Sequence, residues 1–266
     1  MINQGKKNIL GLLVDAIDYE YVVQKIIESA QNKQSCTVAA LSVHAVVNGV
    51  LDQVHQRRLN GLTLLTPDGQ PVRWALNWIY KTNLTDRVYG PDLMLKILAQ
   101  ATFKNLAVYF YGNSYTFENL KTNLLNHFPN LKIVGMQAAQ YRRLSHIERE
   151  QVIEQIHASG AEIVFVGLGC PRQEVWLYEY QKQLSLPLIA VGAAFDFHAG
   201  WVRQAPRWMQ DHGLEWLFRL CQEPGRLWKR YFFYNPIYIW LILLQWIGKK
   251  YTPLMPNGRE SMENYG

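Results

Sequence analysis

Residues 165–176, FVGLGCPRQEVW, join the end of an apolar strand to the start of a polar helix, and this junction decides the fold class. The apolar run ends at Gly167 and Gly169, Pro171 stops it, and a helix-compatible stretch begins at Arg172. A strand that turns tightly into a helix points backbone N–H groups at an anion. The third glycine of the dinucleotide fingerprint is absent and its acidic ribose ligand has no clear candidate, so the turn predicts a phosphate-bearing ligand without naming it.

The same alternation of strand and helix patterns extends outward from this turn in both directions. Strand-like runs occupy residues 36–42, 62–66, 106–112, 131–137, 162–167 and 187–192, and helical patterns occupy 18–30, 44–57, 115–128 and 147–160. We therefore expect an α/β fold, a Rossmann-like layered domain with a mainly parallel sheet. Ligands bind beyond the carboxyl ends of such strands. The site candidates are Ser42, His44, Asp68 and residues 112–113, 167–174 and 192–196.

The composition is that of a globular chain. A sequence of 266 residues with 49% apolar and 18% charged residues can bury a full core. Cys36, Cys170 and Cys221 are odd in number and far apart, which disfavours a disulfide framework or a zinc site and fits a reducing cytosol. The N-terminal stretch has a short apolar run that meets Asp15 and Asp18 at once, so no signal peptide is expected.

Positive charge and tryptophan are concentrated in residues 201–250. This stretch has eight Lys/Arg against three Asp/Glu, which gives +5 of the formal +6, and it holds six of the nine tryptophans. Basic side chains beside interfacial aromatic residues indicate a membrane surface. Nucleic acid is the competing partner, and it is disfavoured because apolar runs such as IYIWLILLQWI have no use on a phosphate backbone.

Within this stretch, residues 231–247 form a 17-residue, largely apolar segment with basic residues on both sides. A spanning helix needs about 20 such residues, so we expect an amphipathic helix in the membrane interface. The alternatives are a short span and packing on the protein's own domain or on a partner subunit in a homo-oligomer. We expect a Rossmann-like domain over residues 1–200, a basic, aromatic-rich helical C-terminal appendage over 201–250 and a disordered tail over 251–266.

Asp68 and Arg87 are the charged residues with the clearest chemical candidacy. Asp68 lies in LLTPDGQPV between a strand and a helix, where a carboxylate can act as a general base or simply bind its own backbone in a turn. Arg87 can bind a phosphate or pair on the surface with Asp86 or Asp92. No D-x-D tripeptide and no metal-type histidine spacing occurs, so we expect no metal site. Arginines and helix N-termini would then stabilise a departing diphosphate.

Five segments together resemble the WecG/TagA/CpsF family of glycosyltransferases, over roughly residues 8–235. They are LLTPDGQPVRWA, DRVYGPDLM, FVGLGCPRQEVWL, VGAAFDFHAGWVRQAPRWMQ and HGLEWLFRLCQEPGRLWKRY. The resemblance implies a peripheral enzyme of the cytoplasmic face of the cell membrane, without metal or other cofactor. It implies inverting transfer of N-acetylmannosamine, or a related hexose or uronic acid, from a UDP-sugar donor to a polyprenyl-diphosphate-linked saccharide in cell-surface polysaccharide synthesis.

The resemblance also implies roles for single residues. Asp68 matches the family's catalytic base, Arg87 the arginine that meets the diphosphate, and Gln173 and Asp196 match donor-side positions near the turn at Gly167 and Gly169. The appendage residues whose family counterparts reach the lipid diphosphate and the bilayer are Arg203, Arg207, Arg219, Arg226 and Arg230. Many members carry a Thr-x-Asn group after an early strand, where this chain has Ser42 and His44, so the identity of the donor sugar stays open.

Two functions of other classes remain as alternatives. A non-catalytic nucleotide-sugar-binding or scaffold protein of a polysaccharide assembly complex would keep the fold and lack the chemistry. An NAD-dependent oxidoreductase is disfavoured by the incomplete glycine motif. The joint presence of Asp68, Arg87 and Gln173 favours the glycosyltransferase.

Overall fold

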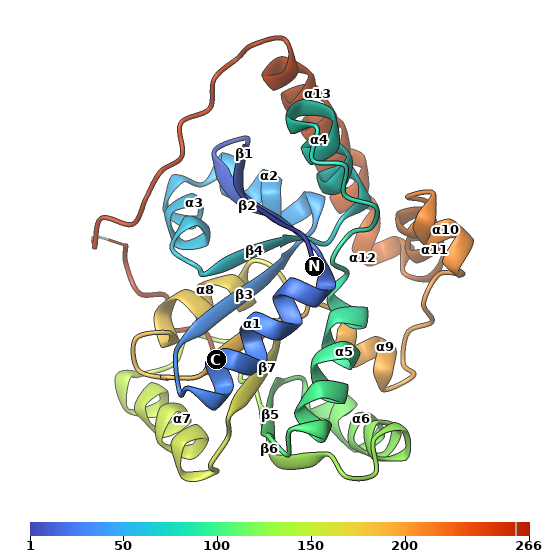
Figure 1. The fold of residues 1–266 in the computed structure, drawn as a ribbon. Coiled ribbons are helices and arrows are strands. Elements are labelled where there is room, and N and C mark those ends of the chain that lie inside the picture. The colour runs from blue at the N-terminus through green and yellow to red at the C-terminus, as the bar shows by residue number, and fades with distance from the viewer. Residues whose placement is uncertain (259) are drawn as a thin grey trace.

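A six-stranded parallel sheet forms the centre of the protein in a computed structural model that describes residues 1–258 and 260–266 (Figure 1). Its strand order is β4-β3-β8-β7-β5-β6, and every neighbouring pair is parallel. The strands are β3 (Cys36–Leu41), β4 (Leu64–Pro67), β5 (Ala107–Gly112), β6 (Lys132–Ala138), β7 (Ile163–Gly167) and β8 (Pro187–Ala190). The expected α/β fold with a parallel sheet is confirmed.

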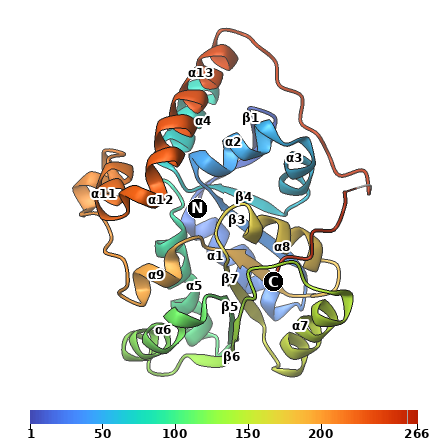
Figure 2. The same ribbon diagram turned by 180° about the vertical axis from the view of Figure 1, so that it is seen from behind.

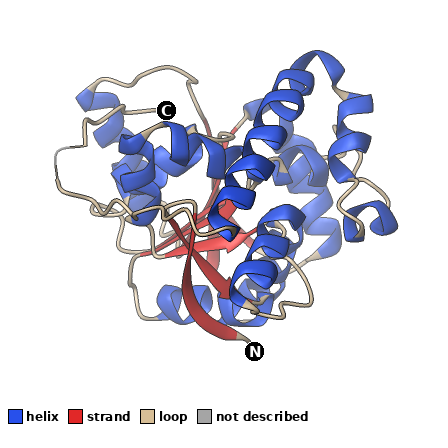
Figure 3. Cartoon of the chain, turned by 90° about the horizontal axis from the view of Figure 1, so that it is seen from above, coloured by secondary structure: helices blue, strands red, loops and turns tan. Residues whose placement is uncertain are grey.

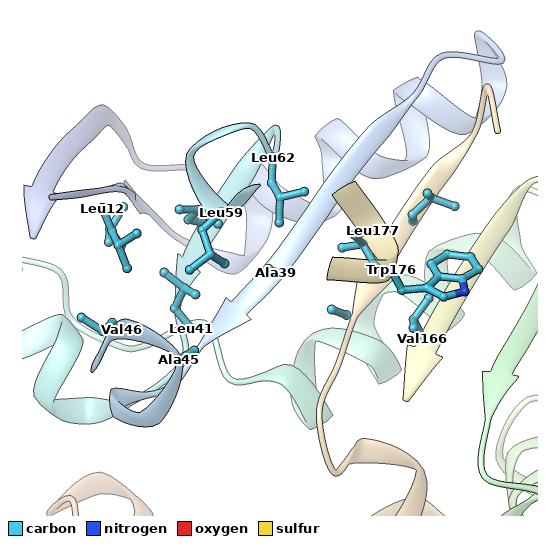
Figure 4. Packing of buried hydrophobic residues seen from close by; sticks show 14 of the residues in the cluster. Leu12, Ala39, Leu41, Ala45, Val46, Leu59, Leu62, Val166, Trp176 and Leu177 are labelled. Carbon is cyan, nitrogen blue, oxygen red and sulfur yellow. The ribbon is translucent and has the colours of Figure 1, made fainter. Parts of the chain in front are cut away.

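Helices cover both faces of this sheet (Figures 2 and 3). One face carries α1 (Tyr19–Gln31), α5 (Gly90–Phe103), α6 (Ser114–His127) and α9 (Ala194–His198). The other carries α2 (Val43–Leu51), α3 (Gln53–Asn60), α4 (Gln70–Tyr80), α7 (His146–Ala158) and α8 (Arg172–Tyr180). Successive strand residues point to opposite faces, so Phe110 and Phe165 pack in the first core while Tyr111 and Val166 pack in the second. Figure 4 shows part of this second core.

An N-terminal hairpin of β1 (Asn3–Ile9) and β2 (Leu12–Ile17) closes one end of the second core, and its sequence pattern does not predict it. The two strands join through Leu10 and Gly11, whose φ angles are +54° and +89°. A two-residue turn with positive φ at both positions matches the right-handed twist of a hairpin. The first strand is mostly exposed and polar, so it lacks the alternating apolar pattern that identifies a strand in sequence.

The single helix expected over residues 44–57 is two helices, α2 and α3. The break lies at Asp52, whose extended backbone leaves the helix. The Asp52 carboxylate accepts hydrogen bonds from Val54 N and His55 N and so caps the start of α3.

The expected C-terminal appendage is present as a helical part, and one face of its last helix packs on the domain. It consists of α10 (Arg207–Asp211), α11 (Glu215–Gln222), α12 (Pro224–Lys229), a π-helical turn η1 (Arg230–Tyr234) and α13 (Asn235–Trp246). Helix α13 lies beside α4 (Figures 1 and 2), where Trp246 stacks on Trp78 at 4.8 Å and Tyr238 and Ile242 are buried. Among the described residues, no helix combines the length and apolar content that crossing a membrane requires.

After α13, the described residues 251–258 and 260–266 run along the domain in an irregular conformation (Figure 2). Asn60 Nδ2 donates to Leu254 O at 2.9 Å, and Arg58 pairs with Glu263 at 2.6 Å. The two carboxylate oxygens of Glu179 accept from the backbone N–H groups of residues 263 and 264. The domain thus supplies buried polar groups that contact the described parts of the tail, and the disorder expected over residues 251–266 stays a prediction.

Candidate active site

The carboxyl ends of β3, β5, β7 and β8 open into a cavity of about 270 Å³, here called the polar cavity. The chain leaves β3 toward one edge of the sheet and β5 toward the other, so this is the switch point at which α/β sheets bind ligands. Nine of the predicted site residues line it: Ser42, Asp68, Gly167, Gly169, Gln173, Asp196, Arg219, Arg226 and Arg230. His44 and Arg87 line an adjoining space of about 100 Å³, here called the junction cavity, together with Ser42, Asp68, Arg219 and Arg230.

Asp68 lies where these two cavities meet, directly after β4. Its Oδ1 accepts a hydrogen bond from Gly90 N at 2.7 Å, which caps the start of α5. Its Oδ2 has no hydrogen bond among the described residues and is free to accept a proton. Burial raises the pKa of the Asp68 carboxyl, and the positive charge of Arg87 opposes this rise. One oxygen therefore fixes the carboxylate and the other is available as a base.

Arg87 is held by the appendage rather than by its sequence neighbours. Its Nη2 lies 2.6 Å from Glu215 Oε2 of α11 and 3.1 Å from Gln210 Oε1. The second oxygen of Glu215 accepts from the Tyr89 hydroxyl at 2.8 Å, and the Arg87 guanidinium stacks on the Tyr89 ring at 4.0 Å. The surface pairing with Asp86 or Asp92 does not occur. In this structure Arg87 is neutralised by protein, and the ion pair ties the appendage to the sheet domain.

The glycine turn after β7 has the geometry that its sequence requires. A Cβ added at Gly167 would lie 2.6 Å from the Phe195 ring, so only glycine allows this close approach. Gly169 has a φ of +74°, and the peptide bond between Cys170 and Pro171 is cis. Gln173 is buried, and its Oε1 accepts from Gly192 N at 3.2 Å, which fixes the turn after β7 against the turn after β8.

Glu174, the last residue of the candidate stretch 167–174, is a second buried carboxyl group at the polar cavity, and its sequence pattern assigns it no role of its own. It is fully buried; its Oε1 accepts from Gln173 Nε2 at 3.0 Å, while its Oε2 has no hydrogen bond among the described residues. Burial raises the pKa of this carboxyl. Its position directly after Gln173 in CPRQE is the sequence signal that could have given it an individual role.

Ser42 and His44 occupy the wall at the start of α2. Ser42 Oγ accepts a hydrogen bond from Arg230 Nη2 at 3.0 Å, so an appendage arginine reaches the end of β3. His44 Nε2 lies 3.4 Å from Asn48 Nδ2, and its ring meets Tyr234 edge-on at 4.6 Å. Burial and the charge of Arg230 lower the pKa of His44 to about 4, so the imidazole is neutral at physiological pH.

The opposite end of the polar cavity is formed by Asp196 and the remaining cavity arginines. Asp196 is half-buried and its Oδ1 accepts from the Tyr115 hydroxyl at 2.9 Å. Burial raises the pKa of the Asp196 carboxyl. Arg226 pairs with Glu223, while Arg219 is 4.0 Å from the same carboxylate. Arg230 forms no ion pair among the described residues, so it is the least neutralised of these cations.

Arg203 and Arg207 do not reach either cavity. Arg203 is exposed, and Arg207 pairs on the surface with Asp86, Asp92 and Asp211. In the part of the chain that the structure describes, no cluster of three or more His, Cys, Asp or Glu side chains is arranged to hold a metal ion.

Comparison with known proteins identifies the family of the chain. A model of the glycosyl transferase WecG/TagA/CpsF family matches residues 7–252. A Bacillus subtilis (strain 168) protein named N-acetylglucosaminyldiphosphoundecaprenol N-acetyl-beta-D-mannosaminyltransferase is 26% identical over 223 residues, which are 83% of this chain and 81% of that protein. A family match over nearly the whole chain, with a polar cavity at the switch point of the sheet, leaves one conclusion. The chain is a glycosyltransferase of the WecG/TagA/CpsF family.

Proposed function

We propose that this glycosyltransferase moves N-acetylmannosamine, or a related hexose or uronic acid, from a UDP donor to a polyprenyl-diphosphate-linked saccharide, with inversion and without a metal ion. The substrates named for the Bacillus subtilis relative support this choice of donor sugar and lipid-linked acceptor. The observation that carries the reaction is Asp68, whose free oxygen lies at the meeting point of two cavities that can each admit one substrate.

Asp68 acts as the general base in this proposal. The acceptor hydroxyl oxygen attacks the anomeric carbon from the face opposite the leaving group, the bond from that carbon to the UDP oxygen breaks, and the hydroxyl proton passes to Asp68 Oδ2. One displacement inverts the configuration. Because Gly90 N holds Oδ1 at 2.7 Å, the carboxylate cannot rotate freely away from the acceptor. A pKa raised by burial brings this base nearer to the working pH than that of an exposed aspartate.

The appendage arginines supply the positive charge for the departing diphosphate. Arg230 has only a hydroxyl partner, and Arg219 has a carboxylate no nearer than 4.0 Å, so both can turn toward an anion at little cost. Fixed cations in a partly enclosed site stabilise charge as it develops on the leaving group. We assign the leaving-group role to Arg219, Arg226 and Arg230, and we assign to Arg87 the positioning of Asp68, whose backbone oxygen accepts from Arg87 Nη1 at 3.3 Å.

The donor occupies the polar cavity in this proposal. The half-buried carboxylate of Asp196 accepts hydrogen bonds from hydroxyl groups of the donor at one end of the cavity. Ser42 and Glu174 face the sugar at the other end, with His44 in the adjoining junction cavity. The turn at residues 167–169, fixed by Gln173, leaves room for the diphosphate between them. Buried polar groups that lack a partner discriminate strongly between sugars, because a sugar that cannot pair with them leaves them desolvated.

The appendage also meets the membrane in this proposal, at the cytoplasmic face and without spanning it. Its large apolar side chains are exposed to solvent over more than half of their surface at Trp201, Trp208, Phe232, Phe233, Ile239, Trp240, Trp246 and Ile247. Lys229 lies among them in sequence, and Lys249 and Lys250 follow them directly. Exposed aromatic residues with flanking cations bind the interface of an anionic bilayer.

The test is UDP release by the purified full-length protein in EDTA, with a panel of UDP-sugars and N-acetylglucosaminyl-diphospho-undecaprenol in anionic vesicles. We expect release with one donor that depends on the acceptor. Asp68→Asn should lower kcat by about 10²–10⁴-fold while UDP affinity changes less than about twofold, because the amide oxygen can still accept from Gly90 N.

Asp92→Asn is the matched control, since Asp92 is a carboxylate of α5 that pairs with Arg207 on the surface and lines neither cavity. It should keep near-normal turnover. UDP binding without release for every donor and acceptor would instead identify a binding or scaffold protein. Loss of both UDP affinity and thermal stability in Asp68→Asn would assign Asp68 a structural role only.

A further inference from the structure

A third cavity, here called the apolar cavity, lies between the appendage and the sheet domain and has no role in the chemistry described above. Its volume is about 370 Å³, within the roughly 300–1,000 Å³ typical of ligand sites. Its walls come from α4, α11, η1 and α13 and are almost entirely apolar or aromatic. The main contributors are Trp74, Trp216, Tyr231, Phe232, Tyr238 and Ile239.

The apolar cavity continues into the site through shared walls. The apolar cavity and the junction cavity share wall residues, among them Val43, Pro71, Trp216 and Tyr231. The junction cavity in turn shares Asp68, Arg219 and Arg230 with the polar cavity. One end of the apolar cavity therefore leads first to the two arginines and then to the proposed general base, Asp68.

The other end of the apolar cavity is exposed on the aromatic surface of the appendage. Phe232 is 66% exposed and Ile239 is 58% exposed, so both serve as cavity wall and as outer surface. At the domain side, the Trp74 ring packs closely on Gly213 of the appendage, where a Cβ would lie 2.5 Å from the ring. The space is thus open to an apolar chain that enters from the surface and ends at positive charge.

We propose that the apolar cavity binds the first isoprene units of the acceptor's polyprenyl chain and so aligns the lipid diphosphate with Arg219 and Arg230. These two arginines line both the junction cavity and the polar cavity, so they can contact the lipid diphosphate on one side and the donor diphosphate on the other. The identification of this chain as the acceptor rests on the proposed function. From the outside inward, the ligand meets an apolar channel with aromatic walls, then cations, then a base. This order fits an amphiphile with an anionic head group and an unsaturated hydrocarbon tail. A protein segment would gain nothing from the cations at the inner end.

The experiment compares geranyl diphosphate with inorganic diphosphate, using isothermal titration calorimetry of the full-length protein. Geranyl diphosphate carries two isoprene units and stays monomeric in water at working concentrations. We expect it to bind at least about tenfold more tightly than inorganic diphosphate, because apolar carbon atoms leave water. Equal affinity of the two ligands for the wild-type protein would overturn the proposal.

Two neighbouring residues of α13 give a matched pair of variants. Ile239 lines the cavity and Trp240 does not, yet their side chains are 58% and 61% exposed. Ile239→Asp should abolish the gain in affinity of geranyl diphosphate over inorganic diphosphate. Trp240→Asp should keep this gain in affinity. Loss of the gain in both variants would show a general surface effect and overturn the cavity assignment.

Two further measurements keep the cavity and the proposed function separable. Trp74→Ala removes a wall from the domain side and should reduce the gain in affinity of geranyl diphosphate. The affinity for inorganic diphosphate should not change, and this unchanged affinity shows that the variant is folded. If the gain is present and depends on Ile239 but no sugar is transferred to any acceptor, the cavity stands and the proposed function fails. If transfer occurs and the gain is absent, the function stands and the cavity assignment fails.

Discussion

The ion pair between Arg87 and Glu215 is expected to determine how firmly the appendage holds to the sheet domain, and Glu215→Gln tests this. Glu215 is the only contact through which α11 neutralises Arg87 among the described residues, and the two side chains are 7% and 13% exposed. Glutamine keeps the shape of the side chain and an acceptor for the Tyr89 hydroxyl. It removes the negative charge and leaves Asp68 as the main remaining carboxylate that interacts with Arg87.

The expected magnitude follows from the burial of the pair. Two unit charges about 4 Å apart attract by about 4 kcal/mol at an effective dielectric constant of about 20. Removing one partner of a buried pair costs roughly 3–5 kcal/mol, because the other charge stays buried. Since the glutamine keeps a neutral hydrogen bond and Asp68 stays near Arg87, we expect the lower end, about 3 kcal/mol, in the free energy of opening the appendage.

Hydrogen–deuterium exchange of α11, followed by mass spectrometry, measures this opening. A loss of about 3 kcal/mol corresponds to roughly 100-fold faster exchange. The exchange of α1, on the far side of the first core, should not change. Asp92→Asn is the control for an exposed pair: its partner Arg207 is 61% exposed, so the change should stay below about 1 kcal/mol, or roughly fivefold in exchange.

A double-mutant cycle with Arg87→Gln decides whether the pair itself is responsible. The coupling between the two substitutions should be about 2–3 kcal/mol, and a coupling below about 0.5 kcal/mol would refute the reasoning. Equal acceleration of exchange in α11 and α1 would also refute it, because that pattern means global destabilisation.

Three other substitutions test further parts of the structure. Arg87→Gln should move the acid limb of the kcat/KM profile to higher pH, because burial raises the pKa of Asp68 and Arg87 opposes this rise. Activity needs the carboxylate and is lost as pH falls through the pKa of Asp68. An acid limb that does not move would exclude Asp68 as the base. Gly167→Ala should lower Tm and turnover together, because a Cβ 2.6 Å from the Phe195 ring costs roughly 1–3 kcal/mol, and a fully active, stable variant would contradict the close approach. Glu263→Ala should destabilise the protein by about 2 kcal/mol, roughly 4–8 °C in Tm, because Arg58 is 1% exposed and loses the carboxylate of Glu263 as its partner. An unchanged Tm would mean that the tail does not stabilise the domain.

The central strands were predictable because parallel strands are buried on both faces and appear in sequence as continuous apolar runs. The segments around β3, β5 and β7 are of this kind. The hairpin at residues 3–17 was not predictable by that signal, since its first strand is polar and its turn uses Leu10 rather than asparagine at the first positive φ. The helix break at Asp52 was missed because an aspartate inside an apolar pattern also fits an exposed helix position.

The site was predictable where its residues follow strands and not where they meet across the chain. Asp68 and Gly167 come directly after strands, so topology alone brings them to one edge of the sheet. The partner of Arg87 lies 128 positions away in the sequence, whereas the surface partners Asp86 and Asp92 are close by, and proximity in sequence favoured the wrong pair. Glu215 could be recognised only as one acidic residue in a basic, aromatic stretch.

Under the proposed function, the division of labour between domain and appendage couples catalysis to the lipid-linked acceptor. The sheet domain supplies Asp68, but among the described residues that line the polar cavity every arginine belongs to the appendage. Without the appendage, the sheet domain would supply the proposed base and none of the arginines that line the polar cavity. The apolar cavity exists only while α11 and η1 lie against α4, so a chain that fills it favours the closed arrangement. The lipid that brings the acceptor would then stabilise the state in which Arg219 and Arg230 face the donor, and UDP-sugar would be cleaved when an acceptor is present rather than by water.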